Sequence, residues 1–284
     1  MVKKAIIPVA GYAVRMLPVT KVLPKAMLNV ANKPVIEYII DEIIDAGIEE
    51  ILLITNSYST IIQEHFSRNY ELEFFLEKDN NYEMLKKLQE KYKNINIYVK
   101  RATSNQSLAN SVYDAKQFIK NEPFLLVLGD EILEDGSVYT KKMIQVYEKI
   151  KLPVIAIKEV ENEEKSNYGI VEGEKIEDNL YLINKMIEKP MPEETTSNLS
   201  IVGRYIFDFS IFEEIKQEIE RGSNDFTKAI FNLKNKKYAM KINCERFDCG
   251  SKIGLIKANI NFALKDKSIR KDVLRYISNI KEEV

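Results

Sequence analysis

The first 55 residues contain a strand, a helix and a second strand in that order, and this order restricts the chain to a small group of folds. Residues 5–7 (AII) form a short apolar run typical of a buried strand, and residues 50–55 (EILLIT) form another. Between them, residues 34–46 (PVIEYIIDEIIDA) place apolar side chains at helical spacing and end before Gly47. Such a unit favours an α/β fold with a parallel sheet and helices on its faces.

Later segments continue this alternation and then change character. Residues 61–93 and 108–119 have helical patterns, whereas 95–99 and 124–128 read as strands. Beyond residue 150 the strand candidates are short and follow one another, which predicts an antiparallel or mixed extension of the same sheet. These candidates are residues 154–160, 169–172, 181–188, 200–207 and 238–242, with helices predicted at 211–219 and, as a long charged tail, at 254–284.

Length and charge narrow the class of protein. A chain of 284 residues suits one large α/β domain, with or without an appendage. No apolar run is long enough to span a bilayer, and the N-terminus lacks the apolar segment of a secretory signal, so we expect a soluble protein of the cytoplasm. Lys and Arg total 42 against 43 Asp and Glu, so nothing global attracts nucleic acid or an anionic membrane, and an anion site must be local.

Cysteine and histidine are too few for two common kinds of site. Cys244 and Cys249 cannot form a disulfide framework, and with His65 as the one histidine there is no pattern for a zinc cluster. We expect the cysteines to be small packed side chains and His65 to be structural.

A loop that resembles a phosphate-binding loop follows the first strand. Backbone N–H groups around Gly11, at the start of a helical segment, and the cations Arg15 and Lys25 suit a polyphosphate. Ala13 and Val14 stand where such loops often have further glycines, because glycine lets the backbone approach phosphate oxygens. A tight turn with solvated cations is the alternative.

Carboxylates and a lysine follow predicted strands elsewhere. Asp130 comes directly after the buried run 124–128, at the edge where open α/β sheets bind ligands, and suits Mg²⁺ or simply a polar strand end. Asp248 is a second candidate ligand or a cap. Glu188 and Lys189 precede Pro190, and this lysine either neutralises a phosphate or is a solvated surface charge.

A series of short motifs stands in a fixed order along the chain: AIIPVAG, Arg15, Thr20, Pro24-Lys25, Met27-Leu28, LGDEI, YGIVEGE, IEKP, SNLSIVGRYIF and RFDCGSKIGLIKANINFAL. With these motifs the chain resembles, over nearly its whole length, the bacterial UTP–glucose-1-phosphate uridylyltransferases of the sugar-phosphate nucleotidyltransferase superfamily. The resemblance implies a Rossmann-like nucleotide-diphospho-sugar transferase fold, with a mixed, mostly parallel sheet in residues 1–250. It also implies a C-terminal helical extension in 251–284 that serves oligomer contacts, as in a homodimer or homotetramer.

The reaction implied by the resemblance is attack of a sugar 1-phosphate on the α-phosphorus of a nucleoside triphosphate, with release of pyrophosphate. UTP and glucose 1-phosphate are the default pair. By the same resemblance, Arg15 and Lys25 hold the triphosphate, and Asp130 and Asp248 hold Mg²⁺. Lys189 binds the sugar phosphate, Glu188 accepts hydrogen bonds from sugar hydroxyls, and Gly169 and Gly203 let the backbone approach the sugar.

Several positions depart from the family pattern. Ala13 replaces a glycine of the loop, Ala26 replaces a glutamate, and Ala102 stands where the family has the glutamine that recognises uracil. Ser107 and Ala109 replace glycines that allow close approach of the nucleotide. The phosphate and metal residues are retained, so we expect an altered nucleotide site. The same reaction on another base or sugar, and a catalytically silent regulatory homologue, remain alternatives.

Overall fold

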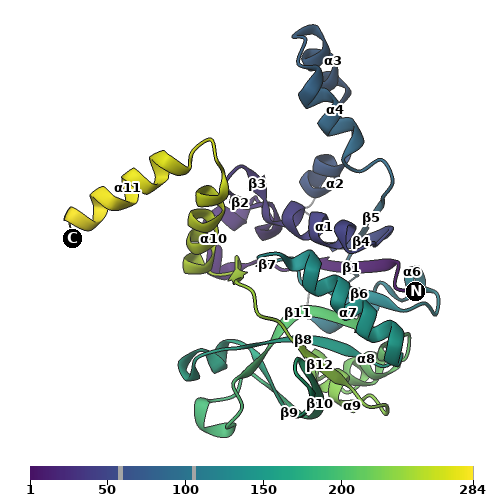
Figure 1. The fold of residues 1–284 in the computed structure, drawn as a ribbon. Helices are drawn as coiled ribbons and strands as arrows, with labels where there is room; N and C mark the ends of the chain where they lie inside the picture. Colours follow the sequence, from purple (N-terminus) through teal and green to yellow (C-terminus); the bar gives the residue numbers. More distant parts are fainter. Residues whose placement is uncertain (57–59, 104–106, 284) are drawn as a thin grey trace.

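A mixed sheet of nine strands runs through the computed structural model, which describes residues 1–56, 60–103 and 107–283 (Figure 1). In order across the sheet the strands are β5 (Asn96–Arg101), β4 (Glu50–Thr55), β1 (Lys4–Val9), β6 (Phe124–Val127), β11 (Leu199–Phe207), β8 (Val154–Glu159), β12 (Tyr238–Lys241), β10 (Leu180–Glu188) and β9 (Gly169–Glu177). Strands β5, β4, β1 and β6 are mutually parallel, which confirms the strand–helix–strand interpretation. Strand β11 runs antiparallel to both β6 and β8, so the mixed extension is confirmed as well.

Two short ribbons lie outside this sheet. Strands β2 (Asn29–Val30) and β3 (Lys33–Pro34) form one antiparallel pair. Strands β7 (Glu131–Leu133) and β13 (Arg246–Asp248) form the other, and they join two segments that are far apart in the sequence. The second ribbon follows directly from the carboxyl end of β6, so it continues the chain at the edge where parallel strands end.

Helices cover both faces of the sheet, each over its own hydrophobic cluster. One face is packed by α1 (Val35–Asp45) and α7 (Gly136–Ile150), and α10 (Lys252–Lys265) joins the same cluster from beside the β2–β3 and β7–β13 ribbons. The other is packed by α5 (Leu108–Tyr113), α6 (Lys116–Ile119), α8 (Ile211–Glu220) and α9 (Phe226–Asn232). Ala5 and Ile7 of β1 belong to the first cluster and Ile6 to the second, as the alternation of side chains along a strand requires.

The predicted long helices are wrong in their continuity. Residues 61–93 form three helices, α2 (Thr60–Phe66), α3 (Tyr70–Lys78) and α4 (Tyr82–Glu90). Asn69 and Asn81 begin the second and third, because their side chains accept hydrogen bonds from the N–H groups of Leu72 and Met84 at 3.0 and 3.3 Å. The predicted helix at 108–119 is divided into α5 and α6, and the tail into α10 and α11 (Arg270–Glu283).

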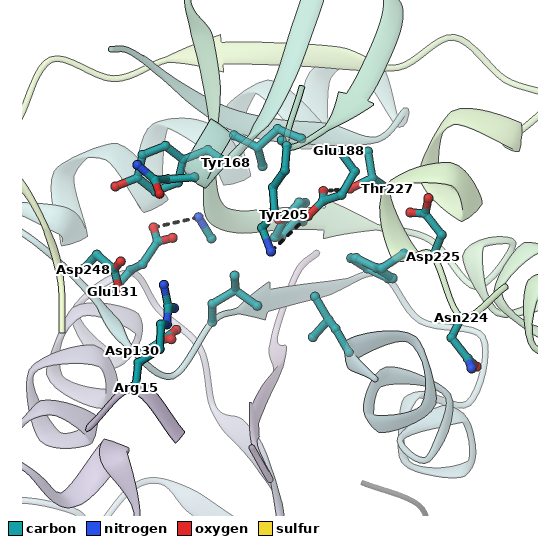
Figure 2. A pocket seen from close by; sticks show the side chains of 18 residues that line it. Arg15, Asp130, Glu131, Tyr168, Glu188, Tyr205, Asn224, Asp225, Thr227 and Asp248 are labelled. Atoms are coloured by element: carbon teal, nitrogen blue, oxygen red, sulfur yellow. Dashed lines mark hydrogen bonds and ion pairs between the residues drawn. The ribbon is translucent and has the colours of Figure 1, made fainter. Parts of the chain in front are cut away.

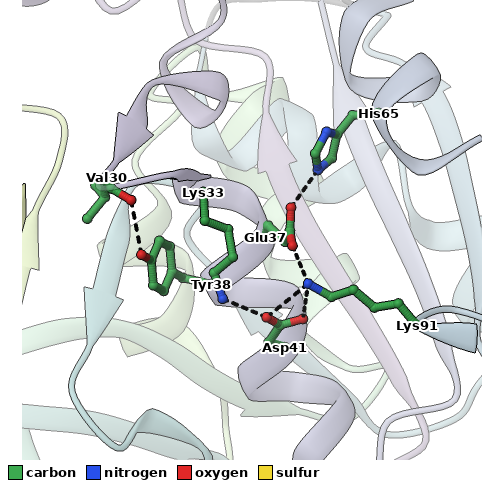
Figure 3. A network of polar contacts seen from close by, with 7 residues as sticks. All are labelled: Val30, Lys33, Glu37, Tyr38, Asp41, His65 and Lys91. Atoms are coloured by element: carbon green, nitrogen blue, oxygen red, sulfur yellow. Dashed lines mark hydrogen bonds and ion pairs between the residues drawn. The ribbon is translucent and has the colours of Figure 1, made fainter. Parts of the chain in front are cut away.

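A polar network ties α2 and the end of α4 to α1 (Figure 3). His65 and Glu37 lie 2.8 Å apart, and Lys91 contacts the other oxygen of Glu37. Lys91 and Lys33 both reach Asp41, at 3.2 and 2.7 Å. His65 therefore has the structural role expected from its isolation.

Two parts of the chain extend away from the central sheet (Figure 1). Helices α3 and α4 project from one side and α11 continues away from α10 (Figure 1). Helix α10 is anchored, since Ala258 belongs to the core and Asn259 Oδ1 accepts from the Ala31 N–H at 2.9 Å. Across the described ranges, every helix falls short of the length and apolar character that a membrane span requires.

Candidate active site

A cavity of about 390 Å³, called here the strand-end cavity, opens where the parallel strands end (Figure 2). Its walls come from the segments that follow β1 and β6, from β9, β10 and β11, and from the start of α9. Of the residues predicted for the site, seven line it: Arg15, Asp130, Gly169, Glu188, Lys189, Gly203 and Asp248. Residues separated by more than two hundred positions therefore meet at one place.

Asp130 and Asp248 converge through the β7–β13 ribbon. Asp248 pairs with Glu131 in the ribbon, and the Cys249 N–H donates to the carbonyl of Asp130 at 2.8 Å. A Cβ placed on Gly250 would lie 2.9 Å from Asp130 Oδ2 and 2.9 Å from Asp248 Oδ1. The two carboxylate oxygens are therefore at most twice 2.9 Å apart. Only a glycine at position 250 avoids placing a Cβ between them.

This pair of carboxylates fits Mg²⁺. Both donors are hard oxygens, and Mg²⁺ in nucleotide sites typically takes one or two carboxylates together with substrate phosphates. Among the described residues there is no cluster of three or more His, Cys, Asp or Glu side chains that would build an all-protein metal cage. A shared site completed by substrate phosphates is the arrangement that these donors suit.

The cations reach this position from the loop after β1. Lys25 Nζ contacts Asp130 Oδ2, and Arg15 Nη2 lies 3.7 Å from the Cβ position of Gly250. The expected helical segment is instead three short 3₁₀ turns, Val14–Met16, Val19–Lys21 and Lys25–Met27, interrupted by Pro18 and Pro24. A proline lacks the N–H that a continuous helix needs, so the loop folds in steps.

Ala13 has a left-handed backbone, with φ 48° and ψ 52°. Glycine adopts this region without cost, whereas an L residue there is strained by about 1–2 kcal/mol. The Thr20 hydroxyl donates to the Ala13 carbonyl at 3.0 Å and holds the loop in this shape. The loop therefore has a glycine-type conformation at a position that alanine occupies.

Glu188 and Lys189 lie on the opposite wall. Thr227 Oγ1 donates to Glu188 Oε2 at 2.6 Å, and Lys189 Nζ lies 3.6 Å from Glu188 Oε1. A Cβ on Gly169 would sit 3.2 Å from the same Oε2, so this glycine leaves room for the carboxylate. Lys189 itself has a positive φ of 46°.

Gly203 lines the cavity but is also required for packing. A Cβ there would meet Leu128 Cβ at 2.6 Å, which allows β11 to pass close to the end of β6. Its N–H donates to Glu131 Oε2 at 3.0 Å, and its carbonyl accepts from the Leu128 N–H at 2.9 Å. Its backbone polar groups are therefore already bonded within the protein.

Four positions expected to contact the nucleotide, one of them at its base, do not line this cavity. Gly11, Ala13, Ala102 and Ser107 are absent from its lining. Ala102 donates its N–H to the Thr55 carbonyl at 2.7 Å, and Ser107 begins α5 by accepting from the Asn110 N–H at 3.2 Å. Gly11 borders a separate cavity of about 370 Å³ beside the loop. Ser104, Asn105 and Gln106 lie outside the described residues.

Eleven of the eighteen lining residues were not selected from the sequence, several of them polar. Glu131, Tyr168, Asp225 and Thr227 all face the cavity. Burial raises the pKa of the Glu131 carboxyl, and the charge of Arg246 opposes part of that rise. Its place next to Asp130 was a usable signal for Glu131. No local pattern distinguishes Thr227.

Cys249, between Asp248 and Gly250, is chemically quiet. Burial raises the pKa of its thiol to about 12, with Asp130 and Asp248 adding to the rise. A neutral buried thiol is a poor nucleophile, so this cysteine serves packing.

Comparison with known proteins identifies close relatives. A family described as nucleotidyl transferase matches residues 4–264. UTP–glucose-1-phosphate uridylyltransferase 1 of Staphylococcus saprophyticus subsp. saprophyticus is 38% identical over 283 residues, covering 98% of this chain and 99% of the relative. A UTP–glucose-1-phosphate uridylyltransferase of Staphylococcus epidermidis is 37% identical over 98% of each chain.

Solved structures agree with this assignment of fold. The UTP-bound UGPase of Acinetobacter baumannii superposes with a TM-score of 0.91 at 30% identity, covering 98% of this chain and 99% of that one. A UDP-glucose pyrophosphorylase complexed with UDP-glucose superposes with a TM-score of 0.84 at 31% identity, covering 94% and 100%. The Rossmann-like transferase fold expected from the sequence is confirmed.

Proposed function

This chain belongs to the nucleotidyl transferase family, and from that membership we propose that it transfers the uridylyl group of UTP to glucose 1-phosphate, giving UDP-glucose and pyrophosphate. The observation that supports this most is the convergence of Asp130 and Asp248 over Gly250, beside Arg15 and in a cavity that also holds Glu188. These are the groups that a nucleotide triphosphate and a sugar phosphate require.

The chemistry needs positioning and charge neutralisation more than covalent catalysis. An oxygen of the sugar phosphate attacks the α-phosphorus, the bond to the β-phosphate oxygen breaks, and pyrophosphate leaves. We assign Arg15 and Lys25 to the triphosphate, where fixed cations stabilise charge that develops in the transition state. We assign Asp130 and Asp248 as ligands of Mg²⁺, which when bound neutralises phosphate charge and orients the two substrates. The family generally uses a divalent metal.

The sugar is assigned to the wall formed by β9, β10 and α9. Glu188, oriented by Thr227, accepts hydrogen bonds from sugar hydroxyls, and Lys189 binds the sugar phosphate. Gly169 keeps space for Glu188, while Gly203 brings the β11 backbone to the cavity. The oxygen acceptors on this wall suit a ligand rich in hydroxyl groups.

A second candidate function is the same reaction with a broader choice of base. The chain has Ala102 where the resemblance predicts a uracil-reading glutamine, and a methyl group makes no hydrogen bond to a base edge. Gly11, Ala13 and Ser107 remain our candidates for contact with the nucleotide. Loss of a discriminating hydrogen bond predicts a weaker preference for UTP.

A pyrophosphate-release assay with glucose 1-phosphate and each of UTP, CTP, ATP and GTP tests both functions. Release with UTP and Mg²⁺, abolished by EDTA, is the expected result. Comparable release with a second nucleotide supports the broader specificity. No release with any nucleotide contradicts the enzymatic proposal and favours the silent regulatory homologue.

We also propose that the chain assembles as a homodimer or homotetramer through the extension at residues 251–284, the main domain being 1–250. Large apolar side chains are exposed along both helices of the extension, including Ile253 at 61%, Ile256 at 54% and Tyr276 at 69%. Exposed apolar residues gathered on projecting helices are typical of protein interfaces. We propose a cytoplasmic location, which the two free cysteines support because thiols persist in a reducing compartment.

A further inference from the structure

A buried ion pair lies behind the strand-end cavity. Arg204 of β11 is 0% exposed and Glu42 of α1 is 7% exposed, and neither lines the cavity. The guanidinium bonds the carboxylate twice, Nε to Oε1 and Nη2 to Oε2, each at 2.7 Å. Thr140 Oγ1 donates to the same Oε1 at 2.7 Å, and Gly136 of α7 leaves the space that Glu42 occupies.

Stability alone does not explain this pair. Removing two charges from water is unfavourable, and replacing a buried ion pair by packed apolar side chains is often neutral or stabilising. An apolar core at this place would avoid that desolvation cost, so the ion pair needs an explanation other than stability. Its remaining hydrogen bonds indicate what it does.

Those hydrogen bonds lead to the candidate metal ligands. Arg204 Nη2 also donates to the carbonyl of Glu131 at 3.0 Å, and Nη1 donates to the carbonyl of Gly203 at 3.1 Å. Glu131 is the residue after Asp130, and its own side chain accepts from the Gly203 N–H at 3.0 Å. The guanidinium thus joins β7 to β11 beside Asp130.

The β7–β13 ribbon depends on such attachments, because it is not part of the nine-stranded sheet. Asp130 directly precedes β7, and Asp248 ends β13. From the β13 side, Arg246 Nη1 donates to the Ile201 carbonyl at 3.2 Å. The fork of Arg204 attaches the β7 side, where the first of the two carboxylates emerges.

We propose that Glu42 and Arg204 are positioning residues that hold the β7–β13 ribbon and so set the relation between Asp130 and Asp248. The inference rests on the proposed function, since it takes these two carboxylates to be the ligands of a divalent cation. Groups behind metal ligands typically change metal affinity by about 10–100-fold when removed. Arginine suits the task because its planar fork bonds several acceptors at once, which the single ammonium of lysine does not.

Two variants separate positioning from stability. The double variant Glu42→Leu/Arg204→Met removes both charges together, so the core stays neutral and the melting temperature should stay within a few degrees of the wild type. Arg204→Lys keeps a positive charge beside Glu42 but loses the forked contacts to the Glu131 and Gly203 carbonyls. Lys4→Met/Glu122→Leu is the matched control. That ion pair, at 2.6 Å, lies at the start of β1, whereas the strand-end cavity lies beyond the end of β1.

The readout is the gain in UTP affinity that Mg²⁺ provides, measured by calorimetric titration with excess Mg²⁺ and again with EDTA. We expect this gain to fall at least about tenfold in both Arg204 variants. Their UTP affinity in EDTA should stay within threefold of the wild type. The control variant should keep the full gain. If the double variant does not fold, Arg204→Lys decides by the same measure. A folded variant that keeps the full gain overturns the inference and leaves the proposed function intact. A wild type without any gain overturns the metal assignment itself and the inference with it.

Discussion

Lys25 and Asp130 form an ion pair at the edge of the strand-end cavity, with the lysine Nζ on Oδ2 of the carboxylate, although 105 residues separate them in the chain. They meet because β1 and β6, which lead into their two segments, are neighbouring parallel strands. Each side chain is about one fifth exposed, at 21% and 19%. The cation assigned to the triphosphate and the carboxylate assigned to Mg²⁺ therefore occupy one place, where both are able to contact the same ligand.

Replacing either member of this pair should depress turnover. We expect Lys25→Ala and Asp130→Ala each to lower kcat by at least about a hundredfold, the scale of losing an electrostatic or metal contact in a transition state. Lys33→Ala is the matched control, because Lys33 also forms an ion pair with an aspartate, Asp41, at 2.7 Å, but borders neither of the two cavities beside the loop. Pyrophosphate release measures the rates, and circular dichroism verifies folding. Equal rates for wild type and either variant would refute these roles.

Thr227 should determine how well Glu188 binds the sugar. Thr227→Val removes the hydroxyl that donates to Glu188 at 2.6 Å, so the carboxylate loses its orientation. A hydrogen bond to a charged group contributes about 1.5–3 kcal/mol. We expect the KM for glucose 1-phosphate to rise about tenfold or more, with the KM for UTP unchanged. Thr227→Ser, which keeps the hydroxyl, should behave as wild type, and identical KM values for the Val and Ser variants would contradict the assignment.

Glu37 should stabilise the fold in a pH-dependent way. Burial alone would raise the pKa of Glu37, but hydrogen bonds from His65 and Lys91 outweigh it and hold the pKa at about 2, against 4.5 for the free group. Since the folded pKa is the lower one, the stabilisation is complete above about pH 4.5 and is lost as the pH falls toward 2. We expect Glu37→Gln to lower the free energy of unfolding at pH 7 by about 1–3 kcal/mol.

Urea unfolding at pH 7, 5, 4 and 3 measures the free energy of unfolding of the wild type and of Glu37→Gln. The difference between the two proteins should shrink toward pH 3. Glu83→Gln is the control. It removes an exposed pair with Lys87 on α4, and such surface pairs contribute little. A Glu37→Gln effect that is the same at every pH would show that the network in Figure 3 acts through packing alone.

The wild type should select weakly for UTP over other nucleotides, and one substitution should strengthen that preference. With Ala102 in place of the expected glutamine, we expect the preference of the wild type for UTP over CTP to stay below about a hundredfold. Ala102→Gln should raise that preference roughly tenfold or more, because a glutamine amide both donates and accepts. Calorimetric titration of UTP, CTP, dTTP, ATP and GTP with Mg²⁺ measures the affinities. A wild-type preference above a hundredfold would refute relaxed recognition.

Light scattering should find a dimer or a larger assembly at micromolar concentration. Leu274→Glu/Tyr276→Glu places charges among the exposed apolar residues of α11, where Leu274 is 44% and Tyr276 is 69% exposed. We expect this variant to dissociate without loss of helix content. Lys271→Glu, on the same helix, is the control for charge. A wild type that stays monomeric with and without UTP would rule out a stable assembly.

Local pattern in the sequence predicted much of the framework. The sequence correctly identified the apolar runs of β1, β4 and β6 and the helical spacing of α1. Burial of a whole strand requires a continuous apolar run, and burial of one helix face requires apolar residues at helical spacing, so both appear in the sequence. The retained motifs also indicated the residues that line the cavity, such as Asp130, Glu188 and Asp248. The divisions at Asn69 and Asn81 were missed, since a capping side chain differs little from a solvated one until its helix is in place.

Tertiary structure alone decided which of these groups act together. Glu188 and Thr227 are 39 positions apart, Glu131 and Gly203 are 72 apart, and Glu42 and Arg204 are 162 apart. The first pair meets because α9 packs against β10, and the other two meet because β11 lies beside β6, from which the chain continues into β7. This packing depends on the burial of both sheet faces at once, which is a property of the assembled core and not of any one segment, so no local pattern predicts it.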